Sequence, residues 1–199
     1  MTFSIVARCV RTGQLGMAVS SSSPAVAARC AHAKAGVGVV ASQNITDPRL
    51  GPKTLLAMAE GHSAPEAVKM IINAAKNADF RQLLAVDARG NAAIYSGSKS
   101  LGTHADFASH NAAAAGNLLA NPAIPETMVT AFHQGTGHLG DRLIDAMRAA
   151  LALGGEAGAL HSAGLLLVGE QEWPMADLRC DWTEDCPIEA VAAAWDIYK

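Results

Sequence analysis

The sequence predicts an α+β protein, folded as a four-layer αββα sandwich of two mostly antiparallel sheets. Strand-like segments occur at both ends of the chain, helical segments occur in two pairs between them, and tight turns join several consecutive strands. Half of the 199 residues are hydrophobic and 17% are charged, which suits one domain over residues 1–199 with a sizeable core. The same order of elements also fits a single sheet covered by helices on one face.

Periodicity and turn residues give the positions of these elements. The small, apolar residues 36–43 are typical of a strand that is buried on both faces. Ser63 and Glu66 form a capping box at the start of a helix. We expect strands at residues 3–10, 15–20, 36–43, 81–87, 92–96, 111–119, 162–168 and 177–182. We expect helices at residues 53–60, 64–76, 125–133, 139–153 and 187–198.

Three polar or glycine-rich segments separate these elements. Residues 97–110 are expected to form a loop, and the glycine-rich residues 154–158 a mobile linker. The segment Ser20-Ser21-Ser22-Ser23-Pro24 is compatible with a flexible loop, a helix N-cap or the wall of a polar pocket.

Composition argues against several classes of function. The formal net charge is −3 and the basic residues are scattered, so no nucleic-acid partner is expected. No apolar run reaches the about 18 residues of a membrane helix, and the first residues lack a signal-peptide pattern, so we expect a cytoplasmic protein without a membrane partner. The four cysteines and seven histidines show no metal-ligand spacing. We therefore expect free thiols, no metal and no cofactor.

Thr2 is the first candidate for chemistry. It follows Met1 at the start of a predicted core strand, at a Met-Thr junction that methionine aminopeptidase can process. Removal of Met1 would place a hydroxyl and a free α-amino group on one residue, which is a known way to combine a nucleophile with its base. The alternative is that Thr2 is an ordinary strand residue.

Several short segments, in this order and spacing, resemble one family along essentially the whole chain. They are Thr2 to Ala7, Gly13 to Val19, Ala35 to Gly38, Gln43 before the Thr46-Asp47-Pro48 turn, Gly51-Pro52, Gly116-Asn117-Leu118, Ser162 to Val168, Asp177-Leu178-Arg179 and Pro187-Ile188. The family is catalogued as domain of unknown function 1028 and is placed with the N-terminal-nucleophile (Ntn) hydrolases. The resemblance implies the αββα fold and a Thr2 nucleophile. Longer relatives carry a C-terminal extension suggested to bind peptidoglycan, and this chain stops short of one.

The resemblance also directs attention to further site residues. In an Ntn site the α-amino group accepts the hydroxyl proton, and a cation such as Lys34 keeps that amine neutral. The oxyanion is stabilised by Asn117, or by a backbone N–H near Gly38 or Gly116. Lys34 is otherwise a solvated strand-end residue, and Asn117 a turn residue. The residues expected to line the pocket are Ser20, Ser21, Ser22, Gln43, Asn44 and His161. The serine run, Lys34 and His161 depart from the usual family pattern.

Two classes of function follow from this sequence. The first is a hydrolase that cleaves a small amide, or a related C–N bond such as an imine or enamine, in a metabolite. The second is a non-catalytic scaffold that retains Met1 and binds a small molecule or a protein partner. Exposed strand edges and the low aromatic content of 5% lead us to expect a homo-oligomer.

Overall fold

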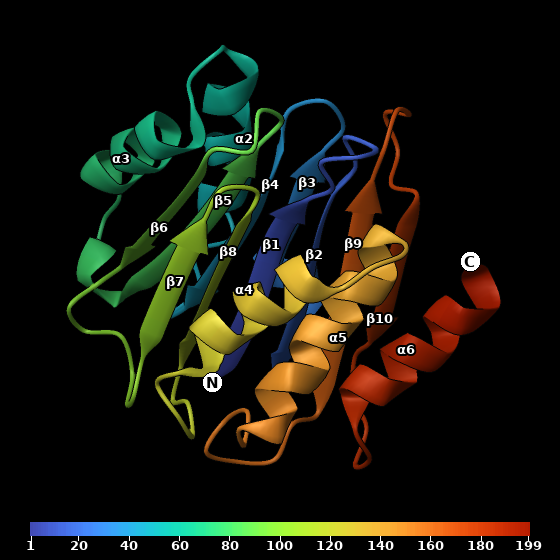
Figure 1. Ribbon diagram of the computed structural model, residues 1–199. Coiled ribbons are helices and arrows are strands. Elements are labelled where there is room, and N and C mark those ends of the chain that lie inside the picture. The colour runs from blue at the N-terminus through green and yellow to red at the C-terminus, as the bar shows by residue number, and fades with distance from the viewer.

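Two antiparallel sheets form the centre of the computed structural model, which describes residues 1–199 (Figure 1). The larger sheet has six strands in the order β10-β9-β2-β1-β8-β7, and the smaller has four in the order β3-β4-β5-β6. Every neighbouring pair is antiparallel. The strands are β1 (Thr2–Arg8), β2 (Leu15–Ser21), β3 (Ala31–Lys34), β4 (Gly38–Asn44), β5 (Arg81–Asp87), β6 (Ala92–Ser96), β7 (Ala105–Ser109), β8 (Ala112–Asn117), β9 (Ser162–Val168) and β10 (Ala176–Cys180).

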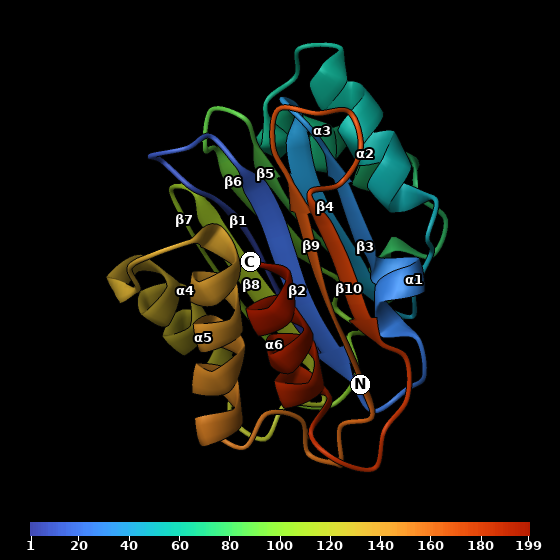
Figure 2. The ribbon, with the colours of Figure 1, turned by 90° about the vertical axis from the view of Figure 1, so that its right-hand side faces the viewer.

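Helices cover the outer face of each sheet, which gives four layers (Figures 1 and 2). The helices α4 (Ile124–Gln134), α5 (Leu139–Ala152) and α6 (Pro187–Tyr198) pack on the larger sheet. The helices α2 (Leu50–Ala59) and α3 (Ala64–Ala74) pack on the smaller one. Two short helices, α1 (Val26–Cys30) and the 3₁₀ turn η1 (Ala78–Phe80), lie in connections. The predicted αββα sandwich is therefore confirmed over the one-sheet alternative.

Three hydrophobic clusters fill the spaces between the four layers. Phe3, Ile5 and Phe132 belong to the cluster between the larger sheet and its helices. The cluster between the sheets includes Val6 and Val39, and a third lies under α2 and α3. Successive side chains of a strand point to opposite faces, so Phe3 and Ile5 face the helices while Thr2, Ser4 and Val6 face the smaller sheet. This alternation places the Thr2 side chain between the two sheets.

Most of the expected elements are confirmed, including the capping box of Ser63 and Glu66 at the start of α3. Residues 97–110 are not entirely a loop, since Ala105–Ser109 form β7, the edge strand of the larger sheet. No strand is expected from the sequence at Ala31–Lys34, yet these residues form the edge strand β3. Both edge strands are short and alanine-containing, so their side chains carry little strand signal.

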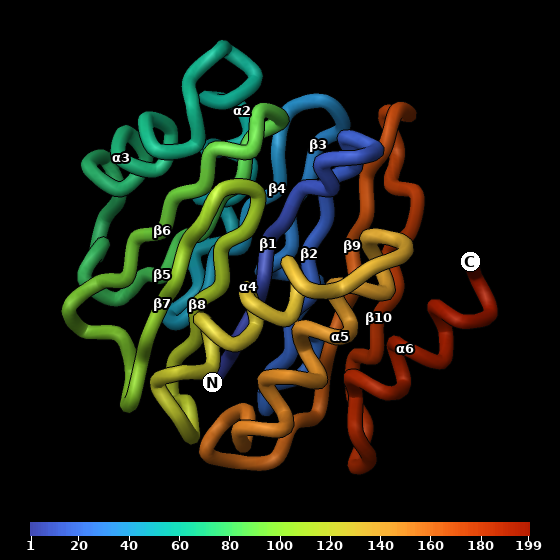
Figure 3. Tube along the Cα trace, in the orientation of Figure 1, coloured from blue at the N-terminus to red at the C-terminus, as the bar shows by residue number.

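The expectation of a mobile linker at residues 154–158 is wrong for its centre. Glu156 is 4% exposed and bridges to Leu119 just beyond β8. The trace leaves α5 and passes the amino end of β1 before entering β9 (Figure 3). This segment therefore closes the end of the sandwich at which the chain begins.

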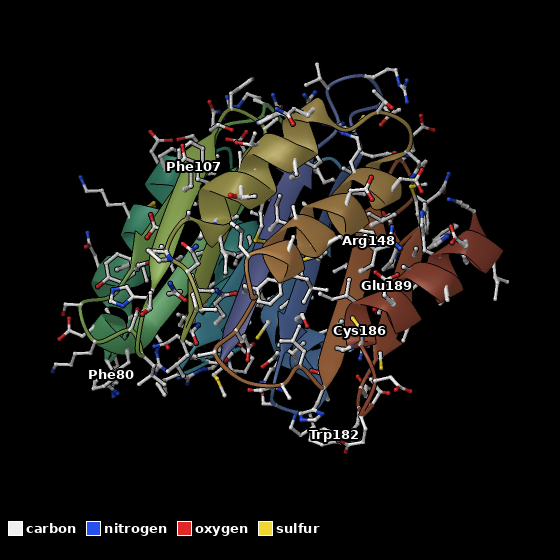
Figure 4. All side chains as sticks on the ribbon, turned by 60° about the horizontal axis from the view of Figure 1, so that its bottom comes forward. Phe80, Phe107, Arg148, Trp182, Cys186 and Glu189 are labelled. Carbon is white, nitrogen blue, oxygen red and sulfur yellow. The ribbon has the colours of Figure 1, made fainter.

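Charged contacts join the helices on the surface. Arg148 of α5 and Glu189 of α6 lie beside each other (Figure 4), and the guanidinium donates hydrogen bonds of 2.8 and 2.7 Å to the carboxylate.

All four cysteines are free, with Cys186 exposed. No helix has both the length and the hydropathy needed to cross a membrane.

Candidate functional site

A row of four polar side chains crosses the larger sheet where β1 begins. Thr2 pairs with Asn117 of β8, and Ser21 of β2 pairs with Ser162 of β9. The hydroxyl oxygens of Thr2 and Ser21 are 3.3 Å apart, which joins the two pairs into one row. Side chains that lie opposite each other share a face, and this face looks toward the smaller sheet. All four residues are buried.

Met1 covers this row. The Thr2 and Ser21 hydroxyls both donate to the Met1 carbonyl oxygen. The side chain of Met1 lies against Gly158, where an added Cβ would be 3.3 Å from the Met1 methyl carbon. In this form the Thr2 nitrogen belongs to a peptide bond, so Thr2 has no free amine.

A chain of donors points at the same carbonyl. The Arg29 guanidinium donates to the Ser23 hydroxyl, whose oxygen lies 2.8 Å from that of Ser21. Because Ser21 uses its proton on Met1, Ser23 must donate to Ser21. Arg29 is held in place by the carbonyl oxygens of Pro24 and Ala25, at 2.6 and 3.0 Å. The positive charge of Arg29 thus polarises a hydrogen-bond chain that ends at a carbonyl oxygen.

Glu156 lies beside this cluster and is a buried carboxyl group. Its Oε2 atom accepts a 3.1 Å hydrogen bond from the backbone N–H of Ser22, while its buried Oε1 atom has no partner. Burial raises the pKa of Glu156 to about 7, against the opposing effects of the Met1 ammonium, the Ser22 hydrogen bonds and His161. Glu156 therefore exchanges its proton near neutral pH.

This raised pKa predicts a pH-dependent stability. Unfolded glutamate has a pKa of about 4.3, so between about pH 4 and 7 the folded protein holds a proton that the unfolded chain has lost. The stabilisation is complete below about pH 4 and is lost as the pH rises through about 7. Glu156→Gln should be more stable than the parent at pH 8 by at least about 1 kcal/mol, and similar to it at pH 4.5.

Urea unfolding at the two pH values measures this difference. Glu170→Gln, at an exposed position, is the control and should shift stability equally at both. The raised pKa would be contradicted if Glu156→Gln and Glu170→Gln behaved alike.

Buried amides form a network behind the row. Gln43 donates to the carbonyl oxygen of Ala115, and Gln82 donates to that of Gly116, both at 3.1 Å. Backbone carbonyls only accept, so these two bonds fix the orientation of both amides. The Gln43 oxygen then accepts from Ser4, at 2.6 Å. The Gln82 oxygen accepts from the amide nitrogens of Gln43 and Asn117, at 3.2 and 2.9 Å.

The network also settles which atom of Asn117 is free. Its nitrogen donates to Gln82, while its buried Oδ1 atom has no partner. From the sequence, Asn117 is expected to donate to an oxyanion. The structure instead leaves Asn117 with a free acceptor, on the strand opposite Thr2.

Lys34 does not join the site. It is exposed at the end of β3, where it pairs with Gly38 at the start of β4. Gln43, which contacts Ser4, lies five residues further along β4, a distance of about 17 Å at about 3.3 Å per residue. The cation that the structure brings to the Thr2 end of the sheet is Arg29. The sequence offered only the short spacing between Arg29 and the serine run as a signal for it.

The other expected pocket residues are divided by the fold. Ser20 pairs with Phe3 and therefore faces the helices, so it points away from Thr2. Asn44 anchors two loops, because its amide contacts Phe80 and Leu101 at 2.6 and 3.2 Å. Gln43 belongs to the buried network and Ser22 contributes its backbone N–H to Glu156.

His161 lies at the edge of the site. Its ring stacks on Trp182 with centroids 4.2 Å apart, and its Nδ1 atom is 2.8 Å from the carbonyl oxygen of Thr183. Trp182 projects from the surface after β10 (Figure 4). His161 lies close enough to Glu156 to lower the pKa of that carboxyl.

Cavities lie at the other end of the sandwich, away from Thr2. Two, of about 400 and 530 Å³, border the turn between β1 and β2 and include Arg11 and Thr12 respectively. Thr2 lines neither of them, because β1 separates the turn from Thr2 by its full length. No group of three or more histidine, cysteine, aspartate or glutamate side chains is arranged to hold a metal ion.

Layers, sheet order and the polar row at the start of β1 define this chain as an α+β protein of the αββα sandwich class. The chain belongs to the family of unknown function DUF1028, whose family model matches residues 2–191. A crystal structure of a member of that family, protein SPO2555 from Silicibacter pomeroyi, has a TM-score of 0.91 and 29% sequence identity. The alignment with it covers 98% of this chain and 88% of that one.

A second solved structure is more distant. Anbu (ancestral beta-subunit) from Yersinia bercovieri has a TM-score of 0.45 and 11% sequence identity, with 98% of this chain and 93% of that chain covered. No protein of curated function matches the sequence.

Proposed function

We propose that this protein is an Ntn-type hydrolase of a small amide or related C–N bond, with Thr2 as its nucleophile after removal of Met1. The main support is the placement of the Thr2 hydroxyl. It lies in a buried polar row, against a carbonyl oxygen to which Ser21 also donates. The family is of unknown function, but the placement with the Ntn hydrolases that the sequence resemblance implies also favours a Thr2 nucleophile.

The proposed reaction has two steps. The Thr2 hydroxyl oxygen attacks the substrate carbonyl carbon, and its proton passes to the free α-amino group of Thr2. The C–N bond breaks as this proton moves to the leaving amine, which leaves an ester on Thr2. Water then attacks the ester, the same amine accepts and returns a proton, and the acid is released.

The neighbouring groups have distinct roles in this scheme. The Ser21 hydroxyl, polarised by Ser23 and Arg29, stabilises the negative charge that develops on the carbonyl oxygen. The free Oδ1 atom of Asn117 accepts a hydrogen bond from the Thr2 amine and orients it. Arg29 is the cation of this site instead of Lys34, and it acts on the oxyanion through Ser23 and Ser21, whereas Lys34 was expected to act on the amine.

The alternative is a binding scaffold that retains Met1. The observation in its favour is the Met1 carbonyl, which occupies the Thr2 and Ser21 hydroxyls together. In such a protein the hydroxyls fix the N-terminus and do no chemistry.

The intact mass of the protein purified from its native organism distinguishes the two functions. The hydrolase requires a mass lower by one methionine residue, and N-terminal sequencing should then begin at Thr2. A mature protein that keeps Met1 throughout would contradict the Thr2 mechanism and favour the binding scaffold.

A further inference from the structure

One carboxylate oxygen of Glu156 takes no part in the proposed reaction. The Oε1 atom has no hydrogen-bond partner and is shielded from solvent, since the residue is only 4% exposed. A buried oxygen of this kind is costly unless a donor reaches it. A donor that comes and goes with a ligand would explain why the folded chain supplies none.

Met1 shows where such a ligand would lie. Its carbonyl accepts from Thr2 and Ser21, and its side chain lies against Gly158. Ser22, next to Ser21, donates to Glu156, which lies two residues before Gly158. Met1 is thus held between the two segments that carry the Glu156 carboxyl and its donor.

The α-ammonium group of Met1 is close enough to Glu156 to lower the pKa of that carboxyl. It acts electrostatically on Glu156, yet it leaves the Oε1 atom without a hydrogen bond, since Met1 is tied to Thr2 through its peptide bond. A free molecule with the same groups is not tied and can bring its amine to Oε1.

From this arrangement we propose that the Met1 position is the acyl subsite of the Thr2 site, and that it takes amides of α-amino acids. The substrate carbonyl oxygen accepts from Ser21 as the Met1 carbonyl oxygen does, with the carbonyl carbon beyond bonding distance of the Thr2 nitrogen, and Glu156 binds the substrate α-ammonium group. An unbranched side chain such as that of methionine lies against Gly158, where a β-carbon on the protein would crowd it. This inference rests on the proposed function, because it requires Met1 to leave.

Two unpartnered acceptors then bind two different amines. Asn117 lies on the strand opposite Thr2 and accepts a hydrogen bond from the Thr2 amine, whereas Glu156 accepts one from the substrate amine. The carboxylate matches a full positive charge better than the amide does. Substrates without an α-amine leave Oε1 unpaired and bind less tightly.

Binding to a catalytically silent protein tests the subsite separately from the reaction. The protein carries Thr2→Ala and begins at residue 2, released from an N-terminal fusion and checked by mass. Isothermal titration at pH 7.5 compares L-methioninamide with 4-(methylthio)butanamide, which lacks only the α-amine. We expect the amine-bearing compound to bind at least about tenfold more tightly.

Two variants connect this preference with Glu156. Adding Glu156→Gln should reduce the ratio of the two dissociation constants to below about threefold, whereas Glu170→Gln should leave it unchanged. Equal binding of the two amides, no binding of either, or a preference that survives Glu156→Gln would each overturn the subsite. Hydrolysis of the same two amides by protein with Thr2 intact is measured in parallel. Turnover without amine preference would overturn the subsite alone, while selective binding without turnover would count against the hydrolase.

Discussion

Thr2→Ala should abolish the reaction of the mature protein with p-nitrophenyl acetate, an activated acyl donor. In the proposed reaction the Thr2 hydroxyl oxygen is the atom that forms the new ester bond, and alanine has no oxygen to form it. Loss of a nucleophile that acts with its base lowers rates by orders of magnitude, and we expect at least about a hundredfold slower release of nitrophenolate above background. Thr2→Ser keeps the oxygen and should retain most of the rate.

Mass spectrometry of the N-terminal peptide identifies the acylated atom. An ester on Thr2 is removed by hydroxylamine, whereas an amide on the α-amino group resists it. Ser20→Ala is the matched control, because it deletes a buried hydroxyl that faces the helices and should leave the rate unchanged. Undiminished acylation of the Thr2→Ala protein at another residue would rule out Thr2 as nucleophile.

Gln82→Met should be the most destabilising of the substitutions considered, at about 3 kcal/mol. Methionine has nearly the volume of glutamine but cannot supply the donors to Ser96 and Gly116 or the acceptor for Gln43 and Asn117. Each buried group left without a partner costs about 1–3 kcal/mol. Packing is largely preserved, so the loss reports on the hydrogen bonds.

Urea unfolding with an unchanged m-value measures this loss. Gln171→Met at an exposed position controls for the change of residue type and should stay within about 0.5 kcal/mol of the parent. A Gln82→Met variant that lost less than about 1 kcal/mol would show that the network contributes little to stability.

The layers of the fold were predictable because turn residues and periodicity act locally. The pattern around Ser63 and Glu66 predicts the start of α3 without any knowledge of the rest of the chain. The strand at Ala105–Ser109 was not predicted because alanine, aspartate and serine have weak strand preference. Its pairing with β8 holds it extended.

The site was predictable only in part, and for a related reason. Thr2 could be singled out because its proposed chemistry depends on its neighbour in the chain. Glu156 lies in a glycine-rich segment typical of a linker, and its burial is decided by strand ends distant in sequence. Placing Lys34 away from the site required the register of β3 against β4, which residue types alone do not encode.

The position of β1 has a practical consequence for anyone who expresses this protein. A purification tag fused to the N-terminus would leave the molecule through the space that Met1 occupies and would stand between Thr2 and Glu156. The carboxyl end is different, since Lys199 pairs with Asp141 at the start of α5, whereas the segment that follows α5 passes the amino end of β1 (Figures 1 and 3). A tag after Lys199 is remote from the polar row. Assays that find no activity with N-terminally tagged protein therefore say nothing about the untagged protein.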